Sequence, residues 1–120
     1  MAESRTPQEL LKELEETLES REVTYGHFSE IADLSTSLRK SWTEQLHAHP
    51  LYSSKRLRLV EEAGVMILHK LSRLACGIPS HRDSWMDIAG YALRTAMELE
   101  RIDEEMWRKI EQESESNDAV

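Results

Sequence analysis

The sequence has one cysteine, Cys76, among 120 residues, so no disulfide can form within the chain. A lone thiol is what we expect of a protein in a reducing cytoplasm. No apolar run approaches the ~20 residues that a membrane-spanning helix needs, and no signal-peptide pattern opens the chain. These absences argue against a disulfide-stapled secreted domain and a membrane protein, and they predict a cytoplasmic location.

The usual motifs of sheets and of catalysis are missing as well. There is no alternating run of β-branched residues, no internal repeat, and no Walker loop, nucleophile elbow, zinc-ligand spacing or Rossmann glycine pattern. The net charge of -8 argues against broad binding to nucleic-acid backbones, which takes many Lys and Arg contacts. A free nucleotide needs only a local basic pocket, so it remains a possible ligand. Solubility explains the acidity, with a DNA-mimic surface as the alternative.

The sequence is rich in helical periodicity. With 39% hydrophobic and 32% charged residues, it suits a single thin helical domain. Apolar residues at helical spacing, separated by Gly and Pro breaks, predict helices over 7–21, 27–47, 54–76 and 80–110. Short connections favour an all-α, four-helix antiparallel bundle spanning 1–111. Residues 112–120 have little to bury, which predicts a disordered acidic tail.

The fourth predicted helix is longer than a compact bundle of this size needs. Apolar residues continue along its C-terminal half, and one chain has too little surface to cover them all. A second copy would cover them, so the pattern predicts a homodimer that buries part of 97–110. The residues concerned are Met97, Leu99, Ile102, Met106, Trp107 and Ile110.

Two carboxylates mark the start of the fourth helix. Asp83 and Asp87 stand one turn apart and share a face with Gly90, Tyr91 and Arg94. Carboxylates at this spacing repel unless a cation lies between them, and Mg²⁺ both takes such ligands and bridges to phosphates. Helix capping is the alternative for Asp83, since acids are favoured in a first turn. The opposite face is expected to pack and carries Trp85, Ala89, Ala92, Leu93 and Ala96.

Basic residues follow near the end of the third helix. Lys70 and Arg73 lie one turn apart and offer two donors to a phosphate group. Their alternative role is electrostatic, because cations are favoured near a helix C-terminus. His69, directly before Lys70, is interpreted as a surface histidine.

A compact polar turn ends the first helix. It contains Arg21, Thr24, Tyr25 and Gly26. The tyrosine ring can stack on a base, and the glycine allows close approach. A helix C-cap with a left-handed glycine is the alternative. The tryptophans Trp42, Trp85 and Trp107 are expected in the core or an interface.

Three stretches carry a resemblance to small phage and prophage proteins of unassigned activity. They are Arg21-x-x-Thr24-Tyr25-Gly26, Lys70-x-x-Arg73-Leu74 and His81-x-Asp83-Ser84-x-x-Asp87-Ile88-Ala89-Gly90-Tyr91-Ala92. The chain also resembles phage nucleotide-modification-associated domains and, more loosely, MazG-like all-α nucleotide pyrophosphatases. The resemblance covers roughly residues 10–100.

The resemblance to MazG-like enzymes implies a magnesium site. Those enzymes hold Mg²⁺ with a Glu-x-x-Glu pair on one helix and a Glu-x-x-Asp pair on the next. By position, Glu62 stands in the first pair, and Asp83 and Asp87 stand in the second. This chain departs from the pattern, because Val65 and Met66 are apolar and the second pair is spaced by four. The resemblance therefore implies three carboxylates around one Mg²⁺ rather than a two-ion site.

These observations lead to competing hypotheses. The first is a phage-type, Mg²⁺-dependent nucleotide pyrophosphohydrolase, or a nucleotide-binding relative, in the host cytoplasm. Its nucleotide ligands would be Arg21, Thr24, Tyr25, Gly26, Lys70, Arg73 and Tyr91. The second is a non-catalytic phage accessory protein that sequesters a nucleotide signal, or that inhibits a host defence protein through its acidic surface. The third is a purely structural dimer.

Overall fold

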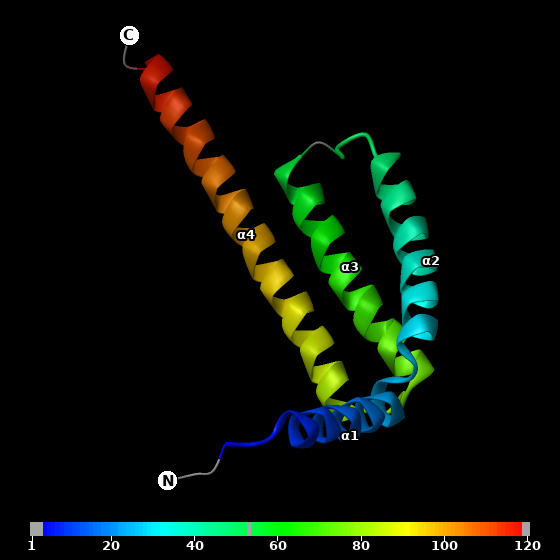
Figure 1. Ribbon diagram of the computed structural model, residues 1–120. Coiled ribbons are helices and arrows are strands. Elements are labelled where there is room, and N and C mark those ends of the chain that lie inside the picture. The colour runs from blue at the N-terminus through cyan, green and yellow to red at the C-terminus, as the bar shows by residue number, and fades with distance from the viewer. Residues whose placement is uncertain (1–3, 53, 119–120) are drawn as a thin grey trace.

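The computed structural model describes residues 4–52 and 54–118, with side chains described as far as Ser116. Four helices make up this part of the chain, and it contains no strand (Figure 1). They are α1 (Pro7–Tyr25), α2 (Phe28–His47), α3 (Lys55–Cys76) and α4 (Arg82–Asp118). The predicted all-α fold with four helices is confirmed.

Side-chain caps mark the starts of α1 and α3. Thr6 forms a capping box with Glu9, and Pro7 occupies the first turn of α1. Ser54 caps α3 by accepting a hydrogen bond from the Leu57 amide at 3.3 Å. The fourth helix was predicted to begin at residue 80, whereas α4 begins at Arg82.

Two helices run further than the sequence predicts. α1 continues to Tyr25 and ends only where Gly26 adopts a positive φ of 86°. α4 continues to Asp118 instead of ending near residue 110, so residues 112–118 are helical where a disordered tail was predicted. Glu and Gln are good helix formers, which favours this extension. The end of the predicted tail, residues 119–120, lies outside the described residues.

α3 is the central helix of the molecule. It packs against α2 on one side and α4 on the other, and the three helices run antiparallel to their neighbours in one layer (Figure 1). α1 does not lie alongside them as in a closed bundle. It crosses the lower end of the layer and contacts mainly α3 (Figure 1). One chain therefore supplies three antiparallel helices, and α1 does not lie beside them as a fourth.

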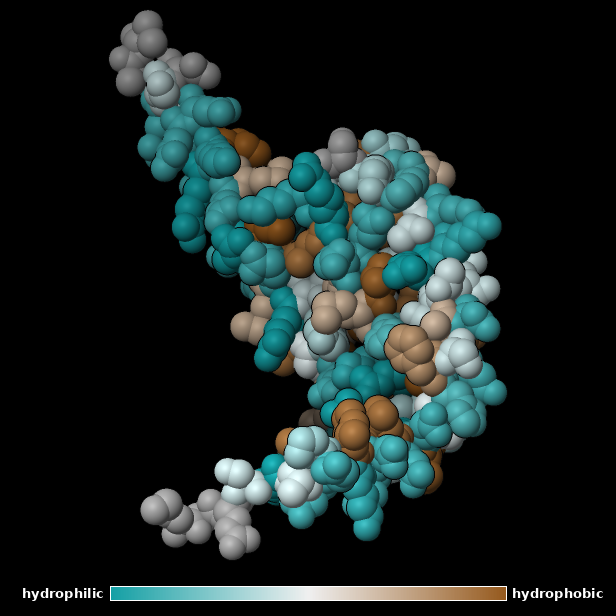
Figure 2. Space-filling model, in the orientation of Figure 1, coloured by the Kyte–Doolittle hydropathy of each residue, from teal (hydrophilic) through white to brown (hydrophobic). Residues whose placement is uncertain are grey.

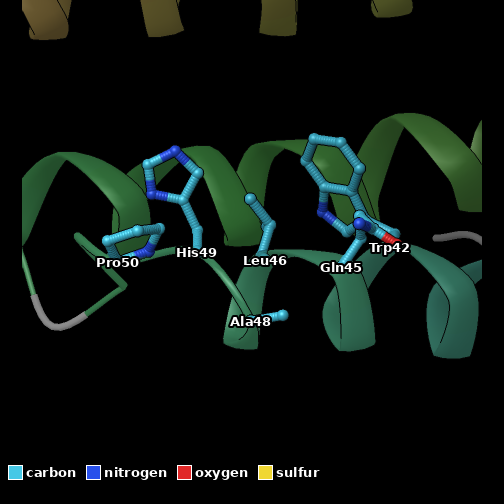
Figure 3. Close-up of a pocket in the computed structure, with 6 residues that line it drawn as sticks. All are labelled: Trp42, Gln45, Leu46, Ala48, His49 and Pro50. Carbon is cyan, nitrogen blue, oxygen red and sulfur yellow. The ribbon is translucent and has the colours of Figure 1, made fainter.

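The contact between α2 and α3 is centred on Trp42. Its indole lies against Gly64, and its Nε1–H donates to the Glu61 carbonyl at 3.2 Å. Figure 3 shows the indole reaching from α2 toward α3, beside the residues that end α2. Trp42 and Pro50 also border a shallow hollow of about 340 Å³. The glycine is what allows the two helices to approach this closely.

A polar corner fixes the turn between these helices. The Glu61 carboxylate accepts a hydrogen bond from the Tyr52 hydroxyl at 3.1 Å and lies 3.1 Å from His47 Nε2. Burial, together with the Glu61 carboxylate, raises the pKa of Tyr52. Glu61 therefore holds the turn through the side chains of His47 and Tyr52.

Glycines also join the end of α1 to the end of α3. A Cβ on Gly26 would lie 2.3 Å from the Cys76 carbonyl oxygen, and one on Gly77 would lie 2.1 Å from the Thr24 carbonyl oxygen. The Ile78 amide donates to that same Thr24 carbonyl at 2.8 Å. The two backbones therefore touch, and this contact fixes the C-terminal end of α1 over α3.

The core of the single chain is small. Among the side chains that the structure describes, the buried apolar ones are Ile31, Leu74 and Ile102. Leu10, Leu14 and Leu18, which gave α1 its helical pattern, are each more than half exposed. Trp85 and Leu93 were expected on a packing face and are also exposed. Figure 2 shows the resulting crescent, with apolar side chains visible near its centre.

Candidate functional site

A pocket of about 370 Å³ lies where α1, α2 and α3 meet. Its size is within the range of small-molecule sites. It combines cations, aromatic rings and apolar side chains from all three helices. The lining residues are Leu18, Arg21, Glu22, Tyr25, Gly26, Phe28, Ile31, His69 and Arg73. Four of them, Arg21, Tyr25, Gly26 and Arg73, were predicted from the sequence to bind a nucleotide.

Arg73 and Tyr25 contact each other in the lining of this pocket. The guanidinium carbon of Arg73 lies 3.8 Å from the centre of the Tyr25 ring, a cation–π contact between α3 and α1. The His81 ring meets the same tyrosine edge-on at 5.5 Å. These contacts explain how two residues 48 positions apart come to share one site.

The two arginines of the pocket have no carboxylate partner within ion-pair distance in the described part of the chain. Glu22 is the one carboxylate that lines the pocket, and it lies 3.4 Å from His27 Nδ1. Arg21 and Arg73 therefore bring positive charge to one cavity in a chain of net charge -8. Guanidinium groups are suited to bind phosphate or carboxylate oxygens.

His69 adds a titratable group to the same wall. Burial lowers its pKa, and the charges of Arg73, Lys70 and Arg39 lower it further. Its Nδ1 lies 3.4 Å from the Ser35 hydroxyl of α2. From the sequence, His69 was interpreted as a surface histidine. Its side chain is exposed, and it also lines the pocket. An anion held here would favour its charged form.

The apolar wall was not predicted from the sequence. Phe28, an apolar residue of the second predicted helix, is 82% exposed and borders the pocket with Leu18 and Ile31. The available signal was its position two residues after Gly26, at the start of α2. An exposed ring beside cations is a surface on which a planar base can stack.

The remaining predicted nucleotide ligands lie outside this pocket. Lys70 donates to Asp87 of α4 at 3.0 Å, so the predicted phosphate donor and the predicted metal ligand pair with each other. Tyr91 borders a separate hollow of about 350 Å³ on α4 with Asp87, Gly90 and Arg94. Thr24 supports the site from behind, because its carbonyl binds the Ile78 amide.

The three predicted magnesium ligands are not brought together. Glu62 is exposed on α3, two turns or ~12 Å along the helix from Lys70, the partner of Asp87. Asp83 is exposed in the first turn of α4, where the helix dipole favours an acid. In residues 4–52 and 54–118, no group of three His, Cys, Asp or Glu side chains is arranged to hold a metal ion.

Comparison with known proteins gives a family but no activity. The family model described as a domain of unknown function, DUF6378, matches residues 9–98. No curated protein and no solved structure gives a significant match. Within the residues that the structure describes, no helix has the length and apolar character needed to span a bilayer. The matched region contains all of the pocket and the Lys70–Asp87 pair.

Proposed function

We propose that this chain, which belongs to the DUF6378 family of domains of unknown function, binds a nucleotide or a similar phosphorylated small molecule in the pocket at the end of α1. The observation that carries the proposal is the convergence of Arg21 and Arg73, both without a carboxylate partner in the described residues, on a cavity with an aromatic wall.

The phosphate end of the ligand is assigned to the two arginines. Each guanidinium can donate two parallel hydrogen bonds to phosphate oxygens. Arg21 comes from α1 and Arg73 from α3, so the ligand would bridge two helices that otherwise make few contacts. Glu22 on the rim disfavours a second anionic group nearby, which limits where the phosphate can lie.

The base is assigned to the apolar side of the pocket. One face of the Tyr25 ring is covered by Arg73, so this ring orients the guanidinium. Phe28 and Leu18 offer free apolar surface at the rim for a planar ring. Gly26 keeps that rim low, because it has no side chain.

The arrangement of the charged groups supports a binding protein better than a hydrolase. The pocket brings together cations and rings, which recognise phosphates and bases, and Glu22 is its one carboxylate. The carboxylates Glu62, Asp83 and Asp87 that would hold Mg²⁺ lie apart. Several expectations from the sequence remain predictions: pyrophosphohydrolase activity, a Mg²⁺ cofactor, the relationship to MazG-like enzymes, a phage origin and the homodimer. Of the two roles of a non-catalytic protein, sequestering a nucleotide signal uses this pocket, whereas inhibition of a host defence protein does not need it.

Calorimetric titration of the purified chain with nucleoside mono-, di- and triphosphates tests this proposal. We expect binding without Mg²⁺, and we expect Arg21→Gln and Arg73→Gln each to weaken it at least tenfold. Arg73→Lys should retain part of the affinity, since it keeps the charge but loses the planar donor fork.

Arg108→Gln is the matched control. It removes the same charge from the far part of α4, where Arg108 pairs with Glu104 at 3.8 Å, and it should leave affinity unchanged. Equal losses in all three arginine variants would show a non-specific charge effect and contradict the pocket. Binding or turnover that depends on Mg²⁺ and is lost in Glu62→Gln would instead support the pyrophosphohydrolase hypothesis.

A further inference from the structure

On its second face, away from the pocket, the layer of α2, α3 and α4 has an apolar surface where α3 lies between its two neighbours. A groove of about 320 Å³ runs along α3 between its two neighbours. On α3, Gly64 and Ile67 line this groove, whereas His69 and Arg73 line the pocket, and the two sets lie ~150° apart around the helix axis. The groove is lined by Trp42, Val60, Ala63, Gly64, Ile67, Ala92, Thr95, Ala96 and Leu99.

The groove continues as a seam along α4. Apolar residues recur there at alternating spacings of four and three, the spacing of helices that pack along their length. α3 leaves most of this seam exposed, because the buried Ile102 lies to one side of it; at Met106, Arg56 of α3 donates to the sulfur at 3.1 Å. Asp103 is the one charged position, and it pairs with Arg56. The seam consists of Trp85, Ala89, Ala92, Ala96, Leu99, Met106 and Ile110.

We infer that this apolar face packs against the same face of a second copy of the chain, and that the protein is an obligate dimer through it. The accessible surface of 9630 Å² exceeds by roughly 3,000 Å² the value expected for a monomer of 13.9 kDa. The radius of gyration of 22.0 Å likewise exceeds the ~14 Å of a compact chain of this length. An obligate homodimer needs roughly 1,000–2,500 Å² from each partner, so the excess is sufficient.

A second copy fits better than a different protein for two reasons. The core of one chain consists of so few side chains that the layer needs a permanent partner, and a second copy is always present at equal concentration. The lining of the groove is also apolar apart from Thr95, so the same face of a second copy can meet it without burying an unpaired charge. The only polar side chain of the groove, Thr95, already donates its hydroxyl proton to the Tyr91 carbonyl at 2.7 Å.

Sedimentation and denaturation test this interface. We expect the wild-type chain to sediment at twice 13.9 kDa at micromolar concentration. Ala96→Glu places a charge in the seam and should yield monomer or unfolded chain. Arg94→Glu, on the polar face of the same helix, is the matched control and should remain dimeric. A folded wild-type monomer, or a dimer of unchanged affinity in Ala96→Glu, would overturn the inference.

Two further measurements apply if Ala96→Glu does not fold. The urea midpoint of the wild-type dimer must rise with protein concentration, because its unfolding separates two chains. In a Cys76→Ser background, Ala92→Cys or Ala96→Cys should form a disulfide-linked dimer more readily than Arg94→Cys. A midpoint independent of concentration, or preferential cross-linking of Arg94→Cys, overturns the interface. None of these changes touches a pocket residue, so the nucleotide proposal is tested separately.

Discussion

Gly64 and Gly90 both lie inside helices, yet replacing each by alanine should change stability in opposite directions. Alanine is favoured over glycine in a helix interior by about 0.8–1 kcal/mol. A Cβ on Gly90 meets no atom within 4 Å, so Gly90→Ala should gain that full amount. A Cβ on Gly64 would lie 2.3–2.5 Å from three atoms of the Trp42 indole. The ring would therefore have to move by about 1 Å to reach ordinary contact distance.

The cost of that movement can be estimated from the contacts of Trp42. Overpacking of this kind costs about 1–3 kcal/mol, and losing the indole hydrogen bond to the Glu61 carbonyl costs about 0.5–1.5 kcal/mol. After the gain in helix propensity, Gly64→Ala should be destabilising by about 0.5–3.5 kcal/mol.

Urea denaturation followed by circular dichroism, at one fixed protein concentration, measures both variants against the wild type. Gly90→Ala is the matched control, because it makes the same chemical change at a helix position where the added Cβ meets no neighbouring atom. If both variants gain stability to the same extent, the packing of Trp42 on Gly64 is not as the structure has it.

Three further predictions concern the pocket and its surroundings. The pKa of His69 is lowered from its ordinary value of 6.5 by folding, so between the two pKa values the unfolded chain binds more protons than the folded chain. The stability that His69 contributes is therefore fully present above pH 6.5 and should be lost as the pH falls through the pKa of folded His69. His69→Gln should flatten this pH dependence of the urea midpoint, and NMR titration should show the pKa of His69 rising when an anion binds. Asp87→Asn should change stability by less than about 1 kcal/mol, because the Asp87 side chain is 55% exposed. It should tighten nucleotide binding by releasing Lys70 near the pocket, whereas abolished binding would favour the magnesium hypothesis. Gly26→Ala should destabilise the chain by at least about 1–3 kcal/mol in thermal denaturation, because φ near 86° with extended ψ is almost restricted to glycine; an unchanged midpoint would contradict the junction between α1 and α3.

Helix positions could be predicted because their signals are local. The capping box at Thr6, the serine cap at Ser54 and the apolar spacing within each segment all act within a few residues. Gly26 was recognised as part of a polar turn, and its positive φ ends α1 there. The polar cluster around Arg21 and Tyr25 and the cation Arg73 could be recognised for the same reason, since each lies on a helix face that periodicity reveals.

Contacts between helices could not be predicted in the same way. Periodicity shows that Asp87 and Lys70 occupy polar faces, but not that they pair with each other. It shows that Glu61 is acidic, but not that a tyrosine and a histidine from the preceding turn bind it. Phe28 has the spacing of a core residue, and only the crossing of α1 over the layer turns it into the rim of a pocket.

The sequence by itself determined that this protein is helical, where its helices begin, and which residues share a helix face, because those properties depend on near neighbours in the chain. Tertiary structure decided which faces meet. It placed Arg73 over Tyr25, separated Glu62 from Asp87, and left the apolar face of α2, α3 and α4 uncovered. The physical reason is that an apolar or charged stripe is compatible with several partners, and the choice among them depends on how closely whole helices can approach.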